Sequence, residues 1–157
     1  MEEWPGSIYQ ISKQTKALIT EEIGNYRTSI LEKDGGRRRS SHRPEKILQH
    51  SCQMGGSDIE GRRKAVKEIL GISCKLPVPT HPGEGLFMVP TTSIRKKECV
   101  WLNYQHFKTC QQQGSQAYIT FWDGSGLFVD ASATQVDAQI KRASQVIVQM
   151  NYGRLFD

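Results

Sequence analysis

Ten arginine and lysine side chains stand in three short clusters, and the chemistry they can do is the binding of phosphate oxygens. Guanidinium and ammonium groups form charge-assisted hydrogen bonds with phosphates, and arginine can do so through two parallel bonds. We therefore interpret the clusters as candidate contacts to a polyanion. The ten residues are Arg37, Arg38, Arg39, Arg62, Arg63, Lys64, Lys67, Arg95, Lys96 and Lys97.

The distribution of charge supports this interpretation more than its total does. The chain of 157 residues has a net charge of +5, from 21 Lys plus Arg and 16 Asp plus Glu. Residues 35–67 alone hold nine basic and three acidic residues, which is a net charge of +6. A concentrated basic stretch is typical of phosphate binding, although a solvated charged surface gives the same pattern.

Cysteines and histidines lack the spacing of a metal site. Cys52, Cys74, Cys99 and Cys110 are separated by 22, 25 and 11 positions. Structural zinc sites usually pair ligands two to four residues apart, and the four histidines form no H-x-x-x-H pair. We therefore expect no metal and no cofactor.

Motifs of catalysis are also missing from the sequence. It contains no G-x-x-x-x-G-K-[ST] phosphate loop, no G-x-G-x-x-G after a strand and no G-x-S-x-G nucleophile elbow. A Cys-dependent enzyme stays open as an alternative, because a cysteine and a histidine can meet in space without being near in sequence. We nevertheless expect that the protein is not an enzyme.

Residue patterns predict a mostly antiparallel β-structure. The clearest signal is a hairpin, because Asp123-Gly124 separates apolar and aromatic runs at residues 117–122 and 127–129. Other strands are expected at residues 7–11, 16–20, 26–31, 85–90, 99–102 and 103–108. Loops are expected at the basic residues 35–44, at the proline-rich residues 75–83 and at the glutamines of residues 111–113.

Two helices are predicted from caps and apolar spacing. The first covers residues 57–71, with Ser57 and Glu60 at capping-box spacing and Gly71 as the C-terminal cap. The second covers residues 134–150, with a capping box expected at Thr134 and Asp137, and we expect residues 151–153 to end it. Its apolar stripe consists of Val136, Ile140, Ala143, Ile147 and Met150.

These elements predict an α+β fold. An antiparallel sheet is covered by the amphipathic C-terminal helix, and a short basic helix lies near the middle of the chain. The length fits one domain over residues 1–157, with residues 35–44 as an exposed basic loop. No apolar run approaches the roughly 18 residues of a membrane helix, and the acidic start is unlike a signal peptide, so we expect a cytoplasmic protein.

A series of short motifs resembles the competence transcription factor family of the ComK type. The run SCQMGGS at residues 51–57, followed by GRR at residues 61–63, is similar to the family's S-C-x-x-x-G-S-x-x-x-G-R-K stretch. The resemblance covers roughly residues 16–150. Further matches in the same order are EEI at 21–23, ILEKD at 30–34, KLP at 75–77, LFMVPT at 86–91, CVWL at 99–102 and TFWDG at 120–124.

This resemblance implies a transcriptional activator of competence for DNA uptake. It would bind double-stranded A/T-rich promoter boxes, mainly through the minor groove, as a homo-oligomer associated with the nucleoid. RNA polymerase or a regulatory protein is a further partner that such a role allows. The segment at residues 37–43 is more basic than the family's corresponding segment, which is largely apolar.

The sequence leaves more than one role open for the basic clusters. As DNA contacts we expect Arg62, Arg63 and Lys64, with Lys67 beside them, and supporting phosphate contacts at residues 37–39 and 95–97. The main alternative is a protein-interaction regulator that has the same fold but has lost DNA binding.

Overall fold

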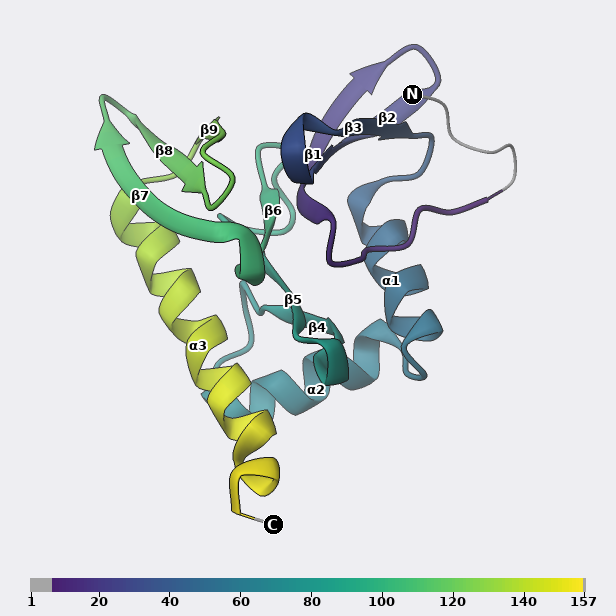
Figure 1. Cartoon of the computed structure of the whole chain (residues 1–157), viewed down its shortest axis with the longest axis vertical. Coiled ribbons are helices and arrows are strands. Elements are labelled where there is room, and N and C mark those ends of the chain that lie inside the picture. Colours follow the sequence, from purple (N-terminus) through teal and green to yellow (C-terminus); the bar gives the residue numbers. More distant parts are fainter. Residues whose placement is uncertain (1–6, 157) are drawn as a thin grey trace.

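Antiparallel β-structure and three α-helices make up residues 7–156, the part of the chain that this computed structural model describes (Figure 1). Side chains are described for residues 7–151. The strands form one sheet of six and one sheet of three, and a long C-terminal helix packs against strands of both. The fold is therefore α+β, as the sequence predicts.

The six-stranded sheet forms the centre of the molecule. Its order is β3-β2-β1-β6-β5-β4, and every neighbouring pair is antiparallel. The sequence predicts β5 as a strand buried on both faces, and all five of its residues are buried. The strands are β1 (Thr15–Ile23), β2 (Tyr26–Glu32), β3 (Arg37–Ser40), β4 (Val78–His81), β5 (Leu86–Pro90) and β6 (Val100–Asn103).

The predicted hairpin is part of the three-stranded sheet. This sheet consists of β7 (Phe107–Gln113), β8 (Gln116–Phe121) and β9 (Gly126–Val129), in that order. Burial alternates along β8, so Ala117, Ile119 and Phe121 face the core while Tyr118 lies on the outer face with Phe128 of β9. The hairpin prediction is confirmed, with the turn at Asp123-Gly124.

Neighbouring residues of β1 point to opposite sides of the central sheet, and so they enter two different cores. Leu18 packs with Ile47 and Leu48 of α1 (Pro44–Met54) on one side. Ala17 packs on the other side with residues of the three-stranded sheet and of α3 (Ala133–Phe156). The central sheet therefore lies between α1 and a second layer built from the small sheet and α3 (Figure 1).

Helix α1 is an element that the sequence analysis missed. Pro44 occupies its first turn, where a missing N–H costs nothing, and the helix buries Ile47, Leu48, Ser51 and Cys52 on one face. That spacing of i, i+1, i+4 and i+5 is helical. The signal was present, but Pro44 was interpreted as the end of a loop.

The two predicted helices form, but their N-terminal caps differ from the expected ones. The first predicted helix is α2 (Ile59–Leu70), which ends at the expected cap Gly71. Its N-cap is Asp58 instead of Ser57, and the Gly61 N–H donates to Asp58 Oδ1 at 2.6 Å. The box at the start of α3 uses Ser132 and Gln135, which bond reciprocally at 3.1 and 3.3 Å. Helix α3 also continues through residues 151–153 to Phe156.

Several predicted loops and strands are wrong, most of them at sheet edges. Residues 37–40 of the expected basic loop form β3, and residues 78–81 of the proline-rich loop form β4. An edge strand tolerates arginine and proline because one side of its backbone needs no ladder partner. Residues 7–11 form no strand, and residues 104–106 form a 3₁₀ turn. Residues 111–113 continue β7 instead of turning.

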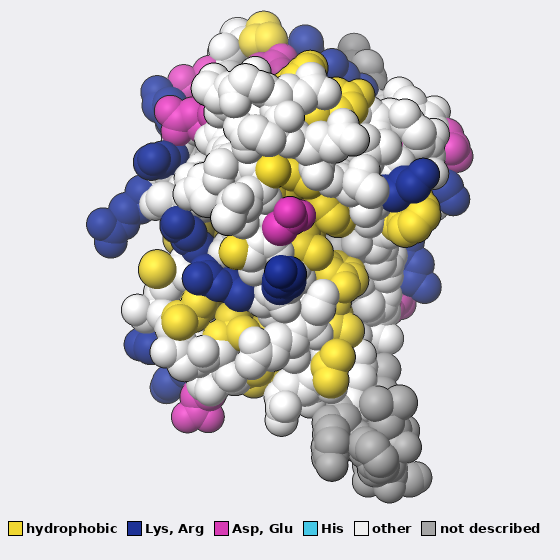
Figure 2. Space-filling model, turned by 90° about the vertical axis from the view of Figure 1, so that its left-hand side faces the viewer, with side chains coloured by type: hydrophobic (Ala, Val, Ile, Leu, Met, Phe, Trp, Pro, Cys, Tyr) yellow, Lys and Arg dark blue, Asp and Glu magenta, His cyan; other side chains and the backbone are white. Residues whose placement is uncertain are grey.

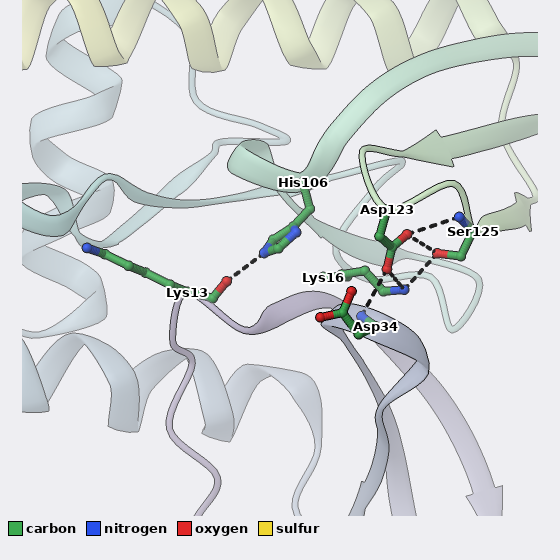
Figure 3. Close-up of polar contacts among 6 residues, drawn as sticks. All are labelled: Lys13, Lys16, Asp34, His106, Asp123 and Ser125. Atoms are coloured by element: carbon green, nitrogen blue, oxygen red, sulfur yellow. Dashed lines mark hydrogen bonds and ion pairs between the residues drawn. The ribbon is translucent and has the colours of Figure 1, made fainter.

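A buried ion pair joins the two sheets. Lys16 of β1 is only 3% exposed, and its Nζ donates to Asp123 Oδ2 at 2.8 Å and to Ser125 Oγ at 2.7 Å in the β8–β9 turn (Figure 3). The Asp34 N–H, in the turn between β2 and β3, donates to the same Asp123 oxygen at 3.2 Å. Asp123 thus connects three segments that are far apart in the sequence.

A second contact beside the ion pair fastens the start of β7. The carbonyl of Lys13 can only accept, so His106 Nε2 donates to it at 2.6 Å (Figure 3). The His106 ring therefore carries its proton on Nε2. Both contacts place the small sheet against the N-terminal end of β1.

Replacing Asp123 by Ala is expected to destabilise the protein by about 3 kcal/mol, because it leaves the Lys16 ammonium buried without its carboxylate. Urea unfolding followed by circular dichroism measures the change. Asp130→Ala is the matched control, since Asp130 is an exposed carboxylate bonded to Gln116 on the small sheet. Equal unfolding midpoints for the two variants would contradict the role of the ion pair.

The same ion pair predicts that the free energy of unfolding falls at acid pH. The Lys16 ammonium, and after it Ser125, hold the pKa of Asp123 well below its ordinary value of about 3.9. A carboxyl with a depressed folded-state pKa stabilises the fold above pH 4 and loses that contribution as the pH falls below it. Urea midpoints at pH 7, 5, 4 and 3 should fall more steeply for the wild type than for Asp123→Asn.

Candidate nucleic-acid interface

Helix α2 carries the basic residues with the strongest sequence signal, and it is anchored by its other face. Ile59 and Val66 are buried, and Gly71 closes the helix in the left-handed conformation with φ of 68°. Lys64 and Lys67 are exposed. These two lysines are therefore free to meet a partner in solution, as the sequence predicts.

Arg63 of the same helix has a structural partner. Its Nη1 and Nη2 donate to the two carboxylate oxygens of Glu45 in α1 at 2.8 and 3.0 Å, and its side chain is only 17% exposed. Burial lowers the pKa of Arg63. The hydrogen bonds and the charge of Glu45, with Glu60 nearby, raise it by more, so the pKa lies above its ordinary value. Arg63 clamps α2 to α1.

Arg62 is half-buried where α1, α2 and β4 meet. Its Nη2 lies 3.4 Å from the carbonyl oxygen of Gly55, and its Nε is buried without a hydrogen-bond partner in the described part of the chain. A Cβ on Gly55 would come within 2.6 Å of the Thr80 carbonyl oxygen, so only glycine allows this approach of α1 to β4. The geometry does not present Arg62 as a free surface arginine.

The third basic cluster, residues 95–97, lies in the loop between β5 and β6. All three side chains are exposed. The loop is held by turn bonds from the Lys96 N–H to the Ser93 carbonyl at 3.0 Å and from the Cys99 N–H to the Lys96 carbonyl at 3.1 Å. At its base, Thr91 and Val100 bond each other. The cluster is thus exposed but fixed at both ends of the loop.

Two neighbouring hollows bring Arg63 of the second cluster together with the third cluster. The first, about 490 Å³ in volume, has Arg63 and Arg95 in its wall. The second, about 150 Å³, has Arg43 at the start of α1 together with residues 95–97. Arg95 lines both hollows. We call the surface formed by Arg43, Arg63, Lys75, Arg95, Lys96 and Lys97 the basic face.

The arginines of β3 lie on a different part of the surface. Arg37 Nε donates to Ser29 Oγ at 3.0 Å, and Arg38 Nε donates to Glu32 Oε1 at 2.9 Å. Arg38 and the half-buried Arg39 line a separate hollow of about 430 Å³ with Tyr9. The structure therefore does not bring residues 37–39 into either hollow of the basic face.

Two residues of the basic face, Arg43 and Lys75, are not among the contacts that the sequence predicts. Arg43 was counted in the charge of residues 35–67 but was not predicted as a contact. Lys75 belongs to the KLP match at residues 75–77, but the stretch is predicted as an extended loop and Lys75 is not among the predicted contacts. No sequence signal marks it as a contact, because its place depends on α3, which lies more than fifty positions away in the sequence.

Figure 2 shows the side of the molecule that carries α3 and the small sheet. Hydrophobic side chains run down this side in a band, and Lys and Arg side chains gather along one border of it. Trp122 is 65% exposed, and Phe128, 50% exposed, packs on the ring of Tyr118. An exposed apolar band of this kind is typical of a contact to another macromolecule.

Three of the four thiols lie in surroundings that disfavour the thiolate. Burial raises the pKa of Cys52 to about 11 and that of Cys110 to about 11, and it also raises the pKa of Cys99. A protonated thiol is a weak nucleophile and a poor metal ligand.

Among the described residues, no group of three or more His, Cys, Asp or Glu side chains is placed to hold a metal ion. Nor is any helix in that part of the chain long and apolar enough to cross a membrane.

Comparison with known proteins decides the family. Residues 7–153 match the family described as ComK protein. The chain belongs to the ComK protein family. A relative named competence transcription factor, from Bacillus subtilis (strain 168), is 28% identical over 142 residues, which cover 89% of this chain and 73% of the relative. No solved structure gives a significant match. The resemblance that the short motifs suggested is confirmed.

Arg63→Ala is expected to lower the free energy of unfolding by about 1 kcal/mol, because it removes the bidentate bond to Glu45 and loosens α2 from α1. Lys64→Ala, one residue away and exposed, is the control and should stay within about 0.5 kcal/mol of wild type. Urea unfolding of the two variants checks this. An unchanged midpoint for Arg63→Ala would show that the clamp adds nothing.

Proposed function

We propose that this ComK-family protein is a sequence-specific DNA-binding activator of competence genes. It binds A/T-rich promoter boxes mainly through the minor groove, acts as a homo-oligomer and works as a single domain. The family supports the coarser statement that the chain is a competence transcription regulator. The observation that carries the finer proposal is the basic face, where Arg43 before α1, Arg63 of α2, Lys75 and the cations of the β5–β6 loop line two neighbouring hollows.

The geometry divides the candidate contacts into two kinds. Lys64, Lys67 and the exposed residues 95–97 have side chains that can reach phosphates, and each such contact releases a counterion. Arg62 and Arg63 are held by Gly55 and Glu45, so their part in binding is to shape the face more than to reach out from it.

The edge strand β3 is the best source of arginines for the groove itself. Residues 37–39 stand on an exposed edge of the central sheet, next to the turn that Asp123 holds. An arginine placed in a narrow A/T-rich minor groove meets enhanced negative potential. We therefore assign β3 to groove contacts and the basic face to the backbone. Arg37 and Arg38 exchange their bonds to Ser29 and Glu32 for bonds to DNA in this assignment, which their exposure allows.

The exposed aromatic patch favours a second role beside DNA binding. Trp122 is approached by Lys108 at 5.5 Å from the ring centre, and Phe128 lies on the same small sheet. Aromatic residues are enriched at protein interfaces. RNA polymerase or a regulatory protein is the partner class that fits, and a family member that kept only this surface would be an interaction regulator without DNA binding.

The triple replacement of residues 95–97 by Ala tests the proposal. Binding to an A/T-rich duplex, followed by fluorescence anisotropy over a range of KCl concentrations, should lose about two to three units of salt slope. The unfolding midpoint should stay close to wild type, because the three side chains are exposed. If wild type itself prefers no A/T-rich duplex over a G/C-rich one, sequence-specific binding is ruled out and the interaction regulator is favoured.

A further inference from the structure

Lys75 is held in a backbone conformation that lysine rarely adopts. Its φ is +54°, in the left-handed region where a side chain crowds the backbone. Glycine normally occupies such positions. A lysine kept there needs surrounding contacts that fix the backbone, and these positions concentrate at functional sites.

Gln139 of α3 supplies those contacts. Its side chain is buried, and Nε2 donates to the Lys75 carbonyl at 2.7 Å and to the Pro90 carbonyl at 3.1 Å. Arg142 Nη1 in turn donates to Gln139 Oε1 at 2.6 Å. The amide is therefore satisfied on both ends, and it ties the Lys75 loop to the end of β5.

The larger hollow of the basic face has the composition of an anion site. Arg63, Lys75 and Arg95 bring three cations into its wall, and Ser73 and Ser93 bring hydroxyl groups. Cys74, Leu76 and Ile94 complete the lining, and none of the described residues in it is a carboxylate. Arg63 already shares its charge with Glu45. Lys75 and Arg95 have no ion pair in the described part of the chain, so they are the cations available to a ligand.

We propose that this hollow seats one phosphate of the DNA backbone, with Lys75 and Arg95 as its contacts and Gln139 as the positioning residue for Lys75. The proposal rests on the DNA-binding function proposed above. A polymeric phosphate is favoured over a free one because Arg95 and Ile94 also line the smaller hollow. Successive phosphates of one strand can therefore pass from one hollow to the next.

Lys75→Gly is the sharpest variant, because glycine keeps the left-handed backbone while the charged side chain is removed. Anisotropy titrations with an A/T-rich duplex at four KCl concentrations should show binding about fivefold weaker, with a salt slope smaller by about one. Lys13→Ala is the charge-matched control, since Lys13 is exposed before β1, and it should leave both quantities near wild type. Equal effects of the two variants would mean that only net charge matters, which overturns the proposal.

The role of Gln139 is separated from simple stability by a double-mutant cycle. Gln139→Leu should weaken DNA binding in the wild-type background, but it should have little further effect when Lys75→Gly is already present, because no lysine is left to position. Gln145→Leu, on an exposed position of α3, is the control. Additive losses in the double variant would show that Gln139 acts only through the fold and would overturn its positioning role.

Inorganic phosphate distinguishes the source of the ligand. Amide NMR shifts of residues 73–76 and 93–95 are followed as phosphate is added to the wild type and to Lys75→Gly. Shifts in the wild type that disappear in the variant, together with the loss of salt slope, support a phosphate seat used by DNA. Shifts without any change in DNA binding assign the hollow to a free phosphate and overturn the DNA assignment. A wild type that binds no duplex at all rejects the proposed function instead.

Discussion

The buried contact between Lys16 and Asp123 is the constraint on which the arrangement of the protein depends. Desolvating two charges is costly, and the attraction compensates only where the geometry is close and the remaining hydrogen bonds are made. Here Ser125 and the Asp34 N–H complete the set around one carboxylate. The small sheet is thereby fixed against the central one, and α3 packs on both. Gln139 of α3 in turn bonds the carbonyl of Lys75. The turn before β3 is held by the same Asp123 carboxylate, which thereby also places the arginines of β3.

The sequence predicted best where burial has a clear period. The alternation of β8, the apolar run of β5 and the spacing of α2 and α3 each reflect a face that must be covered, and these elements were found. In strands at the edge of a sheet, the periodic pattern of apolar residues is lost. Strand β3 is made of three arginines and a serine, and β4 contains Pro79, so neither shows the apolar residues that mark a strand. Only pairing with β2 and β5 makes them strands, and pairing between distant segments is not written in local composition.

The sequence predicts the positive charge of the site, but it does not predict which of the cations have partners within the protein. The lysines of α2 and residues 95–97 are exposed, as expected of residues that meet a polyanion. Arg63 looks the same in the sequence, yet Glu45 lies eighteen positions away on a helix that was not foreseen, and it takes up both of its terminal nitrogens. Lys75 shows the opposite case. It is one lysine among many until its φ and its contact with a buried glutamine are known. Long-range partners decide which cations are available, and spacing does not report them.

Strand β3 has a consequence for the behaviour of the protein in solution. It is the outer strand of the six, so the main-chain groups on one of its sides face no other strand of the sheet. An unpaired edge strand can pair with the same edge of a second molecule, and repeated pairing leads to aggregation. Three adjacent positive charges repel that approach. The arginines of β3 therefore also oppose edge-to-edge association of two molecules. A variant in which all three are neutralised would aggregate through this edge, and a binding assay would record the aggregation as a loss of binding.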